Sequence, residues 1–382
     1  MRIVEICPYD IDRPGGVQRH IRDSAAALVA RGHHVTILAP ATTSPLLPSP
    51  PGVEIVRLGQ ALRIGLSGTR FELSLALGRE RARLKQLMRH GGFDVAHFHT
   101  VWTPFMALQA LRAFSGPAVA TFHDVPPHGL GGRLLRVLFR RLGRALLPRF
   151  DTVVIPSEAP RSHLASAAGQ RVIVLPPFTD LRPFAAAQPQ AGFDDGRLNI
   201  LFVGRLEKRK GAMLLMKAFR AISDIAPLRL IIAGAGPQEA VLRNFSKRHG
   251  LSNVVFAGAP AETAPWFAAC DIFCAPSPYG ESFGIIITEA MAAGKPVVAA
   301  ANAGYRTLLM GKAAAFLVPP GDASALAATL AVLVADKQLR KSLGDWGRAT
   351  APAYDCQFLA PRLEAIFAEA IASHRVKVRN AI

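Results

Sequence analysis

Apolar residues along the chain fall into two kinds of segment that alternate with each other. Short runs of Val, Ile and Leu, such as Ile3 to Cys7 and Val35 to Ala39, are typical of buried parallel strands. Between these two runs, apolar residues recur at the spacing of one helix face: Val17, Ile21, Ala25 and Leu28. A strand, a helix and a second strand in this order form a βαβ unit, so the pattern predicts an α/β fold.

The same alternation continues through the rest of the chain. Further strands are predicted over residues 53–58, 93–99, 118–122, 152–155, 172–175, 199–203, 228–233, 253–257, 271–275 and 296–300. Residues 40–70 are rich in Pro, Gly and Ser, so they are predicted to form a surface loop with the single strand 53–58. Helices are predicted over residues 322–335, 337–348 and 356–373.

Two domains are expected, because 382 residues are many for a single hydrophobic core. The strand and helix pattern restarts near Asn199, after a segment with several prolines. We therefore predict an N-terminal domain over residues 1–176, a linker over 177–197, a C-terminal domain over 198–355 and a last helical segment over 356–382. Both domains are predicted to contain a doubly wound parallel sheet.

The strongest candidate for a binding site is the segment Gly280-Glu281-Ser282-Phe283-Gly284 with the helix predicted from Ile285 onward. It follows a predicted strand and a proline-containing turn, so free backbone N–H groups at the helix start are expected to bind an anion. Glu281 and Glu289 would repel a phosphate at this place. We therefore expect these two carboxylates to accept hydrogen bonds from hydroxyl groups, one from a sugar and one from a ribose.

Two further strand-to-helix turns carry groups suited to a diphosphate. Gly204-Arg205 follows the strand 199–203, and Lys210-Gly211 opens the next helix, so both cations are able to converge on one diphosphate. Gly15-Gly16 follows the first strand, and glycine lets a backbone approach a diphosphate closely. A solvated basic pair and a plain turn are the structural alternatives to these two functions.

Histidines lie at the ends of two predicted strands. His123 follows the strand 118–122, at the edge where open α/β sheets place their ligands. We predict a role in the site for His123. For His97, His99 and His128, a functional and a purely structural role remain open.

The charge of the chain narrows the choice of partner. Basic residues outnumber acidic ones 45 to 27, a net charge of +18, which predicts an acidic partner such as a nucleotide sugar, an anionic lipid or a nucleic acid. Aromatic residues make up 7%, without an RNA-binding signature, so a nucleotide sugar with an anionic membrane surface is favoured and no nucleic acid is expected. No metal or tightly bound cofactor is expected, because the basic residues already supply countercharge.

Two basic stretches are candidates for contact with a membrane. Arg81, Lys85 and Arg89 form one stripe of a predicted helix, and residues 131–147 form a second basic amphipathic segment. A solvated helix face and packing on the sheet are the alternatives. No apolar window approaches the roughly 20 residues of a membrane span.

The cysteine pattern and the start of the chain bear on the compartment. The four cysteines lack metal-binding spacing and are predicted to be reduced core residues: Cys7, Cys270, Cys274 and Cys356. The chain opens directly with a predicted strand, without a signal-like leader. We therefore expect a cytoplasmic protein, with peripheral membrane contact as an option.

These motifs together resemble the GT-B retaining glycosyltransferases of family 4, and bacterial phosphatidylinositol mannosyltransferases in particular. The resemblance rests on Pro-Gly-Gly-Val-Gln ending at Gln18, Ala-Thr-Phe-His ending at His123, Gly-Arg-Leu from Gly204, Lys-Gly from Lys210, and the Glu-x7-Glu frame from Glu281 to Glu289. It implies two Rossmann-like domains facing across a cleft, with the last helix packed on the first domain. Pro177-Phe178-Thr179-Asp180 departs from the Asn-Gly pair usual in the family.

The resemblance also implies roles for individual residues. The catalytic group would comprise His123, Arg205, Lys210 and Glu281. The donor would be bound by Gly15, Gly16, Gln18, Gly204, Ser282, Phe283, Gly284, Ile285 and Glu289. The implied reaction transfers a hexose, mannose first, from a nucleotide diphosphate sugar to a lipid-linked or glycan acceptor of the cell envelope. A sugar-nucleotide epimerase or hydrolase on the same fold is the alternative, and a charge-driven nucleic-acid-binding protein is a third.

Overall fold

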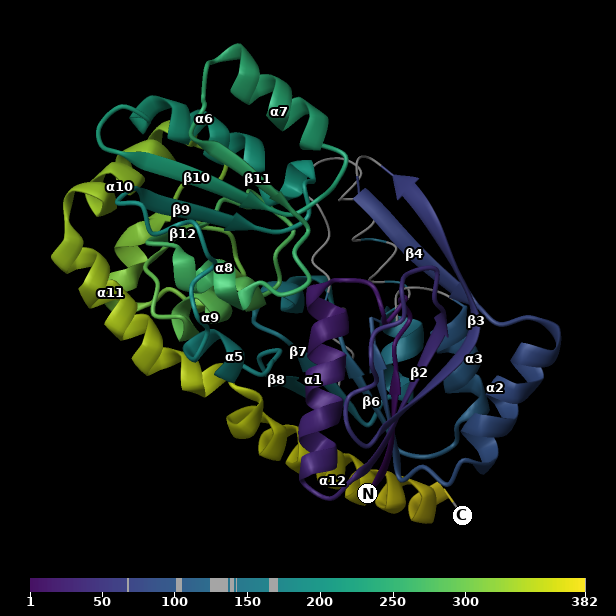
Figure 1. Cartoon of the computed structure of the whole chain (residues 1–382). Coiled ribbons are helices and arrows are strands. Elements are labelled where there is room, and N and C mark those ends of the chain that lie inside the picture. The colour runs from purple at the N-terminus through teal and green to yellow at the C-terminus, as the bar shows by residue number, and fades with distance from the viewer. Residues whose placement is uncertain are drawn as a thin grey trace. The chain divides into compact units, whose positions relative to one another are not determined.

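The structure is a computed structural model that describes residues 1–66, 69–100, 105–123, 137, 141, 143–164 and 171–381. His128 and most of the basic stretch 131–147 lie outside the described residues. The chain divides into two compact units. Unit 1 comprises Met1–Thr179 together with Tyr354–Ile382, and unit 2 comprises Asp180–Ala353 (Figure 1).

Unit 1 is built on an eight-stranded sheet with the strand order β4-β3-β2-β1-β5-β6-β7-β8. The strands are β1 (Arg2–Ile6), β2 (His34–Ala41), β3 (Val53–Leu66), β4 (Thr69–Leu75), β5 (Val95–His99), β6 (Ala118–Thr121), β7 (Thr152–Ile155) and β8 (Val172–Val174). All neighbours are parallel except β3 and β4. This is the parallel α/β arrangement that the alternating pattern predicts.

Helices cover both faces of this sheet. They are α1 (Gly16–Ala30), α2 (Gly78–His90), α3 (Met106–Ala113) and α12 (Cys356–Ala381). One core layer joins Ile3 and Cys7 to apolar residues of α1 and α12, and the other joins Val4 and Ile6 to α2 and α3. Alternate residues of β1 therefore point to opposite layers, and both are buried.

The prediction for residues 40–70 is wrong in its second half. β3 continues to Leu66, and it pairs antiparallel with β4 from Gln60↔Leu75 to Leu66↔Thr69. Gly59, with φ +81°, lies where β3 leaves its register with β2, and a Cβ there would meet the Leu75 carbonyl oxygen at 2.8 Å. The end of β3 is stabilised by pairing with β4, which comes later in the chain. The composition of residues 59–66 alone therefore resembles a loop.

Unit 2 contains a six-stranded parallel sheet with the order β11-β10-β9-β12-β13-β14. Its strands are β9 (Leu198–Val203), β10 (Leu228–Ala233), β11 (Val254–Gly258), β12 (Ile272–Ala275), β13 (Val297–Ala300) and β14 (Leu317–Val318). Its helices are α5 (Arg182–Ala185), α6 (Ala212–Ile222), α7 (Glu239–Arg248), α8 (Ala264–Ala269), α9 (Ile285–Ala292), α10 (Ala323–Ala335) and α11 (Lys337–Thr350). The helices predicted over 322–335 and 337–348 are present as α10 and α11.

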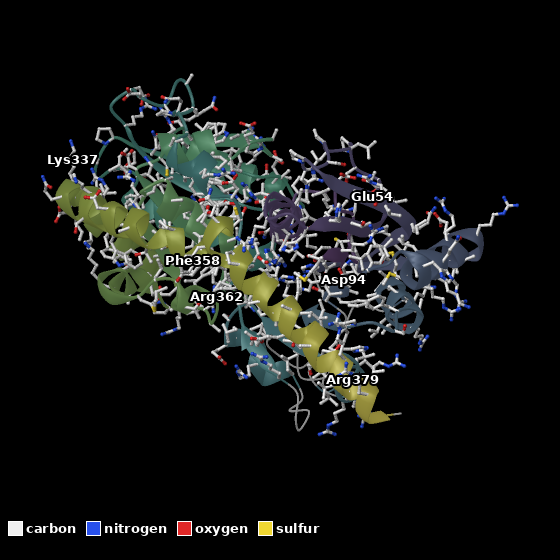
Figure 2. All side chains as sticks on the ribbon, turned by 90° about the horizontal axis from the view of Figure 1, so that it is seen from below. Glu54, Asp94, Lys337, Phe358, Arg362 and Arg379 are labelled. Carbon is white, nitrogen blue, oxygen red and sulfur yellow. The ribbon has the colours of Figure 1, made fainter. Side chains whose placement is uncertain are left out.

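The last helix belongs to unit 1. Leu359, Leu363 and Phe367 of α12 are buried in the core layer that α1 also lines. Near its end, Lys377 Nζ lies 3.0 Å from an oxygen of the Asp151 carboxylate, whose side chain is 4% exposed. Along its outer side Phe358 is 59% exposed (Figure 2). Among the described residues, no helix has the length and apolar content that crossing a bilayer requires.

Candidate active site

A cluster of charged side chains in unit 2 lies where β9 ends. Gly204, with φ +155°, and Arg205 follow β9, and a 3-10 turn, Lys208–Lys210, leads into α6. Gly211 has φ +77°, and a Cβ there would meet the Pro276 carbonyl oxygen at 2.2 Å. Only glycine fits this place, so the turn that carries the cations packs directly on the loop that follows β12.

Glu281 in that loop pairs with two cations of the turn. Lys210 Nζ lies 2.7 Å, and Arg209 Nη1 3.1 Å, from Glu281 Oε1. Glu207 pairs with both arginines: its Oε1 lies 3.0 Å from Arg205 Nη1, and its Oε2 lies 3.4 Å from Arg209 Nε. Arg205 is the most open, with 48% of its side chain exposed against 19% for Arg209 and 21% for Lys210.

The cations set the charge state of Glu281. Burial by itself would raise the pKa of this carboxyl group, but Lys210 and Arg209 outweigh that effect and hold the pKa below its usual range. Glu281 is therefore a carboxylate at neutral pH. Three cations face two carboxylates here, so the cluster has a net positive charge that suits an arriving anion.

The loop between β12 and α9 has the strand–turn–helix form predicted for Gly280 to Ile285. Gly284, with φ +119°, precedes Ile285, the first residue of α9, and a Cβ at Gly284 would meet the Tyr305 ring at 2.7 Å. Phe283 is buried, and so is Glu289 on the second turn of α9. Ser282 is half-buried in the loop.

A small hydrogen-bonded brace supports this loop. The Tyr305 hydroxyl donates to Ser277 Oγ at 3.1 Å, and Asn302 Nδ2 donates to the Ser277 carbonyl oxygen at 2.9 Å. Asn302 Oδ1 in turn accepts a hydrogen bond from the Tyr305 backbone N–H at 2.9 Å. The brace fixes the backbone that carries Glu281 and the start of α9.

The glycine pair predicted to bind the donor lies in unit 1. Gly15 has an extended φ of −178° and precedes α1, which begins at Gly16. The Gln18 side chain lies over Gly15 and donates from Nε2 to the Asp10 carbonyl oxygen at 3.4 Å. Backbone conformation does not require glycine at this place. The close approach of a diphosphate to Gly15, Gly16 and Gln18, together with groups of unit 2, stays a prediction.

His123 belongs to a cluster of buried polar side chains that the sheet register assembles. Glu5 of β1 pairs with His97 of β5, and His99 pairs with Thr121 of β6. Side chains two residues apart share a face of a sheet, so these four residues lie on the same face, with His123 two residues beyond Thr121. The same face is covered by α1, which contributes His20.

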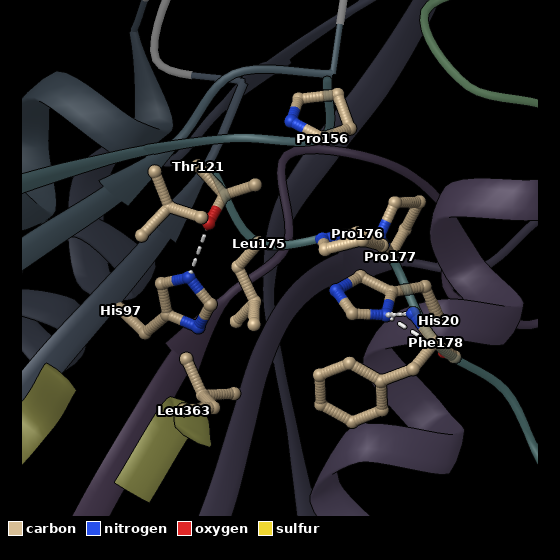
Figure 3. Close-up of a pocket in the computed structure, with 10 residues that line it drawn as sticks. His20, His97, Thr121, Pro156, Leu175, Pro176, Pro177, Phe178 and Leu363 are labelled. Atoms are coloured by element: carbon tan, nitrogen blue, oxygen red, sulfur yellow. Dashed lines mark hydrogen bonds between the residues drawn. The ribbon is translucent and has the colours of Figure 1, made fainter. Parts of the chain in front are cut away.

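Short polar contacts connect this cluster. Glu5 Oε2 lies 2.7 Å from both His99 Nε2 and His97 Nδ1. His99 Nδ1 lies 2.9 Å from His123 Nε2. Figure 3 shows the neighbouring contacts, His97 Nε2 with the Thr121 hydroxyl at 2.7 Å and His20 Nδ1 with the Phe178 backbone, around a cavity of about 10 Å³. Such a cavity holds about one water molecule.

Burial favours the neutral form of three histidines of this cluster. It lowers the pKa of His99 to about 3 and lowers the pKa values of His20 and His123 as well. Glu5 differs, because His97 and His99 hold its pKa below the usual range although burial opposes them. His20, His99 and His123 bring ring nitrogens within 4.8 Å of one another. Neutral imidazoles at such spacing are potential ligands for a metal, but His99 already spends both nitrogens on Glu5 and His123.

Sequence reasoning missed several residues of these clusters. Arg209 adjoins the predicted Lys210 but belongs to none of the motifs, and neither do Asn302 and Tyr305. Glu5 had a detectable signal, because a single carboxylate inside an apolar parallel strand needs a buried partner. The prediction that all four cysteines are core residues is confirmed, since each is free and buried.

Comparisons with known proteins cover the whole chain. Residues 14–182 match the family described as Glycosyltransferase Family 4, and residues 184–350 match the family described as Glycosyl transferases group 1. The chain is 33% identical over 388 residues to the phosphatidyl-myo-inositol mannosyltransferase of Mycobacterium leprae, with 100% of both chains covered. The enzyme of the same name from Propionibacterium freudenreichii is 29% identical, with 96% of this chain and 94% of that protein covered.

Solved structures agree on the fold. Sucrose-phosphate synthase from Thermosynechococcus elongatus matches with a TM-score of 0.78 at 22% identity, over 97% of this chain and 99% of that one. Anabaena HepE in complex with UDP and glucose matches with a TM-score of 0.77 at 21% identity, over 97% and 100%. Because each unit is built on a sheet of mainly parallel strands and the chain is similar over its full length to a mannosyltransferase, the chain belongs to the GT-B glycosyltransferases of family 4.

Proposed function

We propose that this glycosyltransferase transfers a hexosyl unit, mannose as the first candidate, from a nucleotide diphosphate sugar to a hydroxyl group of a phosphatidylinositol-type acceptor, with retention of configuration. The observation that carries the proposal is the cluster of Arg205, Arg209 and Lys210 around Glu281, beside the start of α9. Mannose and the acceptor are proposed because relatives that match the chain from end to end are phosphatidyl-myo-inositol mannosyltransferases. The comparisons give no support to the epimerase or hydrolase alternative.

The cations would stabilise the leaving group. When the bond between the anomeric carbon and the diphosphate breaks, negative charge grows on the diphosphate, and preorganised cations and amides lower the free energy of that state. Arg205 is the most exposed of the three cations, so it is the one best placed to meet an anion that arrives from solvent. Backbone N–H groups from Ser282 to Ile285 and those near Gly16 would bind the same diphosphate.

Glu281 would exchange partners when the donor binds. In the structure its carboxylate accepts from Lys210 and Arg209. A diphosphate would draw the cations away, and sugar hydroxyls would then donate to Glu281, while Glu289 would accept from the ribose. In the retaining step, the bond from the anomeric carbon to the acceptor oxygen forms as the bond to the diphosphate breaks. The acceptor proton passes to a diphosphate oxygen, so no protein base is required.

The acceptor side would lie at a membrane surface. On α2, the apolar Leu84 and Met88 are buried while Arg81, Lys85 and Arg89 are exposed. Together with the net charge of +18, this stripe would attract an anionic bilayer that contains the lipid acceptor. We propose peripheral contact of this kind and no tightly bound cofactor.

The test is a transfer assay with GDP-mannose and UDP-glucose as donors and with vesicles that contain or lack phosphatidylinositol. We expect a mannosylated lipid from GDP-mannose only when phosphatidylinositol is present, and NMR of the product should show the anomeric configuration of the donor. Donor consumption at the same rate without any acceptor would contradict a transferase. An inverted product would remove the retaining mechanism.

A soluble acceptor is the second candidate. D-inositol 3-phosphate glycosyltransferase of Arthrobacter is 29% identical over 88% of this chain and 85% of that protein. The same assay with inositol phosphate in place of vesicles decides between the two acceptors. Faster transfer to inositol phosphate than to the lipid would favour this second function.

A further inference from the structure

Glu5 is a fully buried carboxylate in the middle of the parallel sheet of unit 1. Burying a charge costs several kcal/mol unless hydrogen bonds compensate it. One of its oxygens, Oε2, accepts a hydrogen bond from His99 and lies 2.7 Å from His97 Nδ1, whereas Oε1 makes no hydrogen bond to any residue that the structure describes. The desolvation cost of this carboxylate is therefore not fully compensated, which indicates that Glu5 has a role other than stabilising the sheet.

The contacts of Glu5 determine where protons lie further along the cluster. A carboxylate only accepts hydrogen bonds, so His99 must carry its proton on Nε2. Because His99 is neutral at the pKa given above, its Nδ1 is an unprotonated acceptor. His123 Nε2, at 2.9 Å, must then donate to it, which leaves the lone pair of His123 on Nδ1.

We propose that Glu5 is a positioning residue that acts through His99 to hold His123 in the Nε2–H tautomer, so that Nδ1 of His123 accepts a hydrogen bond from a hydroxyl of the donor sugar. His123 follows β6 at the carboxyl end of the sheet and is 7% exposed, whereas Glu5 and His99 are completely buried. No residue that the structure describes forms a hydrogen bond with Nδ1 of His123. The proposal rests on the proposed function, because the sugar hydroxyl is that of the donor.

The consequence is selectivity for a donated hydrogen bond. With the opposite tautomer, His123 would present an N–H group and would need an acceptor atom on the sugar. Loss of one well-placed hydrogen bond in a site of this kind costs on the order of a tenfold change in binding or rate. Glu5 would therefore influence the handling of the sugar without touching it.

The decisive measurement is the tautomer of His123. In protein labelled with nitrogen-15 in histidine, a long-range nitrogen–proton spectrum separates protonated from unprotonated ring nitrogens, and the His123→Asn variant identifies the signals of His123. We expect Nε2 to be protonated and Nδ1 unprotonated in the parent protein. In Glu5→Met, His99 loses its acceptor, and the proton of His123 should move to Nδ1.

Activity gives the second measurement. Glu5→Met should lower kcat/KM for the donor by about tenfold and leave the KM of the acceptor unchanged, while Glu5→Gln, which offers an oxygen in the same place, should recover part of the loss. Within a set of monodeoxy donor sugars, the one that lacks the recognised hydroxyl should show no further loss in Glu5→Met. Glu54→Gln is the matched control: Glu54 is an exposed acid of unit 1 (Figure 2), and its loss should change neither readout.

The outcomes are distinguishable from those of the proposed function. A parent protein with the proton of His123 on Nδ1, or a tautomer that is the same in Glu5→Met, overturns the proposal, and the first of these outcomes does not depend on the Glu5→Met variant. The spectrum requires no donor or turnover. If the tautomer changes as expected and no sugar is transferred, the proposed function fails while the relay from Glu5 to His123 stands.

Discussion

The two polar clusters of this protein differ in how far solvent reaches them. In unit 1, Glu5, His97 and His99 are buried to 1% exposure or less, and one carboxylate contacts two imidazoles. In unit 2, Arg205, Arg209 and Lys210 keep about a fifth to a half of their side chains exposed and share two carboxylates. The buried cluster contains one arrangement of protons, whereas the open cluster contains ion pairs that an incoming anion is able to replace.

This difference suggests separate roles for the two clusters, one in recognising a hydroxyl group and one in binding the diphosphate. A buried network is costly to change, so it suits the fixed recognition of one hydroxyl group. Partly exposed ion pairs contribute little to stability, so they exchange partners at low cost when a diphosphate arrives. The predictions below follow from that division.

Removing the open cation should have the largest effect. Arg205→Ala is expected to lower kcat by at least about two powers of ten, because it removes a cation that stabilises charge on the leaving diphosphate. Steady-state kinetics checks this, with circular dichroism to verify folding. Lys208→Ala, an exposed cation on the same turn, is the matched control and should retain activity. Near-normal turnover of Arg205→Ala would place this residue outside the site.

Unit 1 also has exposed basic side chains on α2, and replacing them tests whether α2 contacts the membrane. Replacing Arg81, Lys85 and Arg89 by Gln should weaken binding to anionic vesicles by about two powers of ten, at about 1 kcal/mol for each charge. Donor binding should not change. Co-sedimentation with vesicles at low and high salt measures the effect, and unchanged vesicle binding would exclude α2 from the contact.

The turn that carries the open cluster depends on Gly211. Gly211→Ala combines a left-handed backbone with a collision against the Pro276 carbonyl oxygen and should destabilise unit 2 by about 2–3 kcal/mol. Gly250→Ala is the matched control, since Gly250 also has a positive φ but no atom lies within 4 Å of the added Cβ. It should cost about 1 kcal/mol. Equal losses in urea unfolding would show that the collision is relieved.

The smallest expected effect concerns the buried cluster and pH. The pKa of His99 is about 3 in the folded protein and about 6.5 in an unfolded chain, so between these values only the unfolded chain binds the proton. His99 alone should therefore lower the free energy of unfolding by about 1.4 kcal/mol for each pH unit below 6.5 and add no pH dependence above 6.5. His20 and His123, whose pKa values are also lowered, should add to this slope. Measuring from pH 6.5 to 5 avoids the titration of Glu5.

Amide hydrogen exchange in β1 and β5, corrected for its intrinsic pH dependence, measures that slope within unit 1. His99→Gln should remove the contribution of one histidine, and His34→Gln, at an exposed position, should leave the slope unchanged. If the slope of His99→Gln equals that of the parent protein, His99 is not the neutral group that the geometry indicates.

The sequence predicted most of the strands because each is a short apolar run, as at Thr152–Ile155 and Leu228–Ala233. It also predicted the two turns that carry Arg205, Lys210 and Glu281. It did not predict β4, which is stabilised by its hydrogen bonds to β3 more than by its own composition. It also did not predict the hydrogen bond between Glu5 and His99, which are 94 residues apart. Contacts of that kind depend on strand order and register, and local periodicity contains neither.

Unit 1 is formed by two segments that are far apart in the chain, and this affects the order in which the protein folds during synthesis. Leu359, Leu363, Phe367 and the other buried residues of α12 complete a core whose remaining residues precede Asp180. Unit 1 is therefore incomplete while all of unit 2 has already been synthesised. On the ribosome we expect the second unit to reach its native packing first, against the usual order from the N-terminus. Until α12 emerges, the apolar surface beside α1 would stay exposed, and this is when chaperones would find the nascent chain.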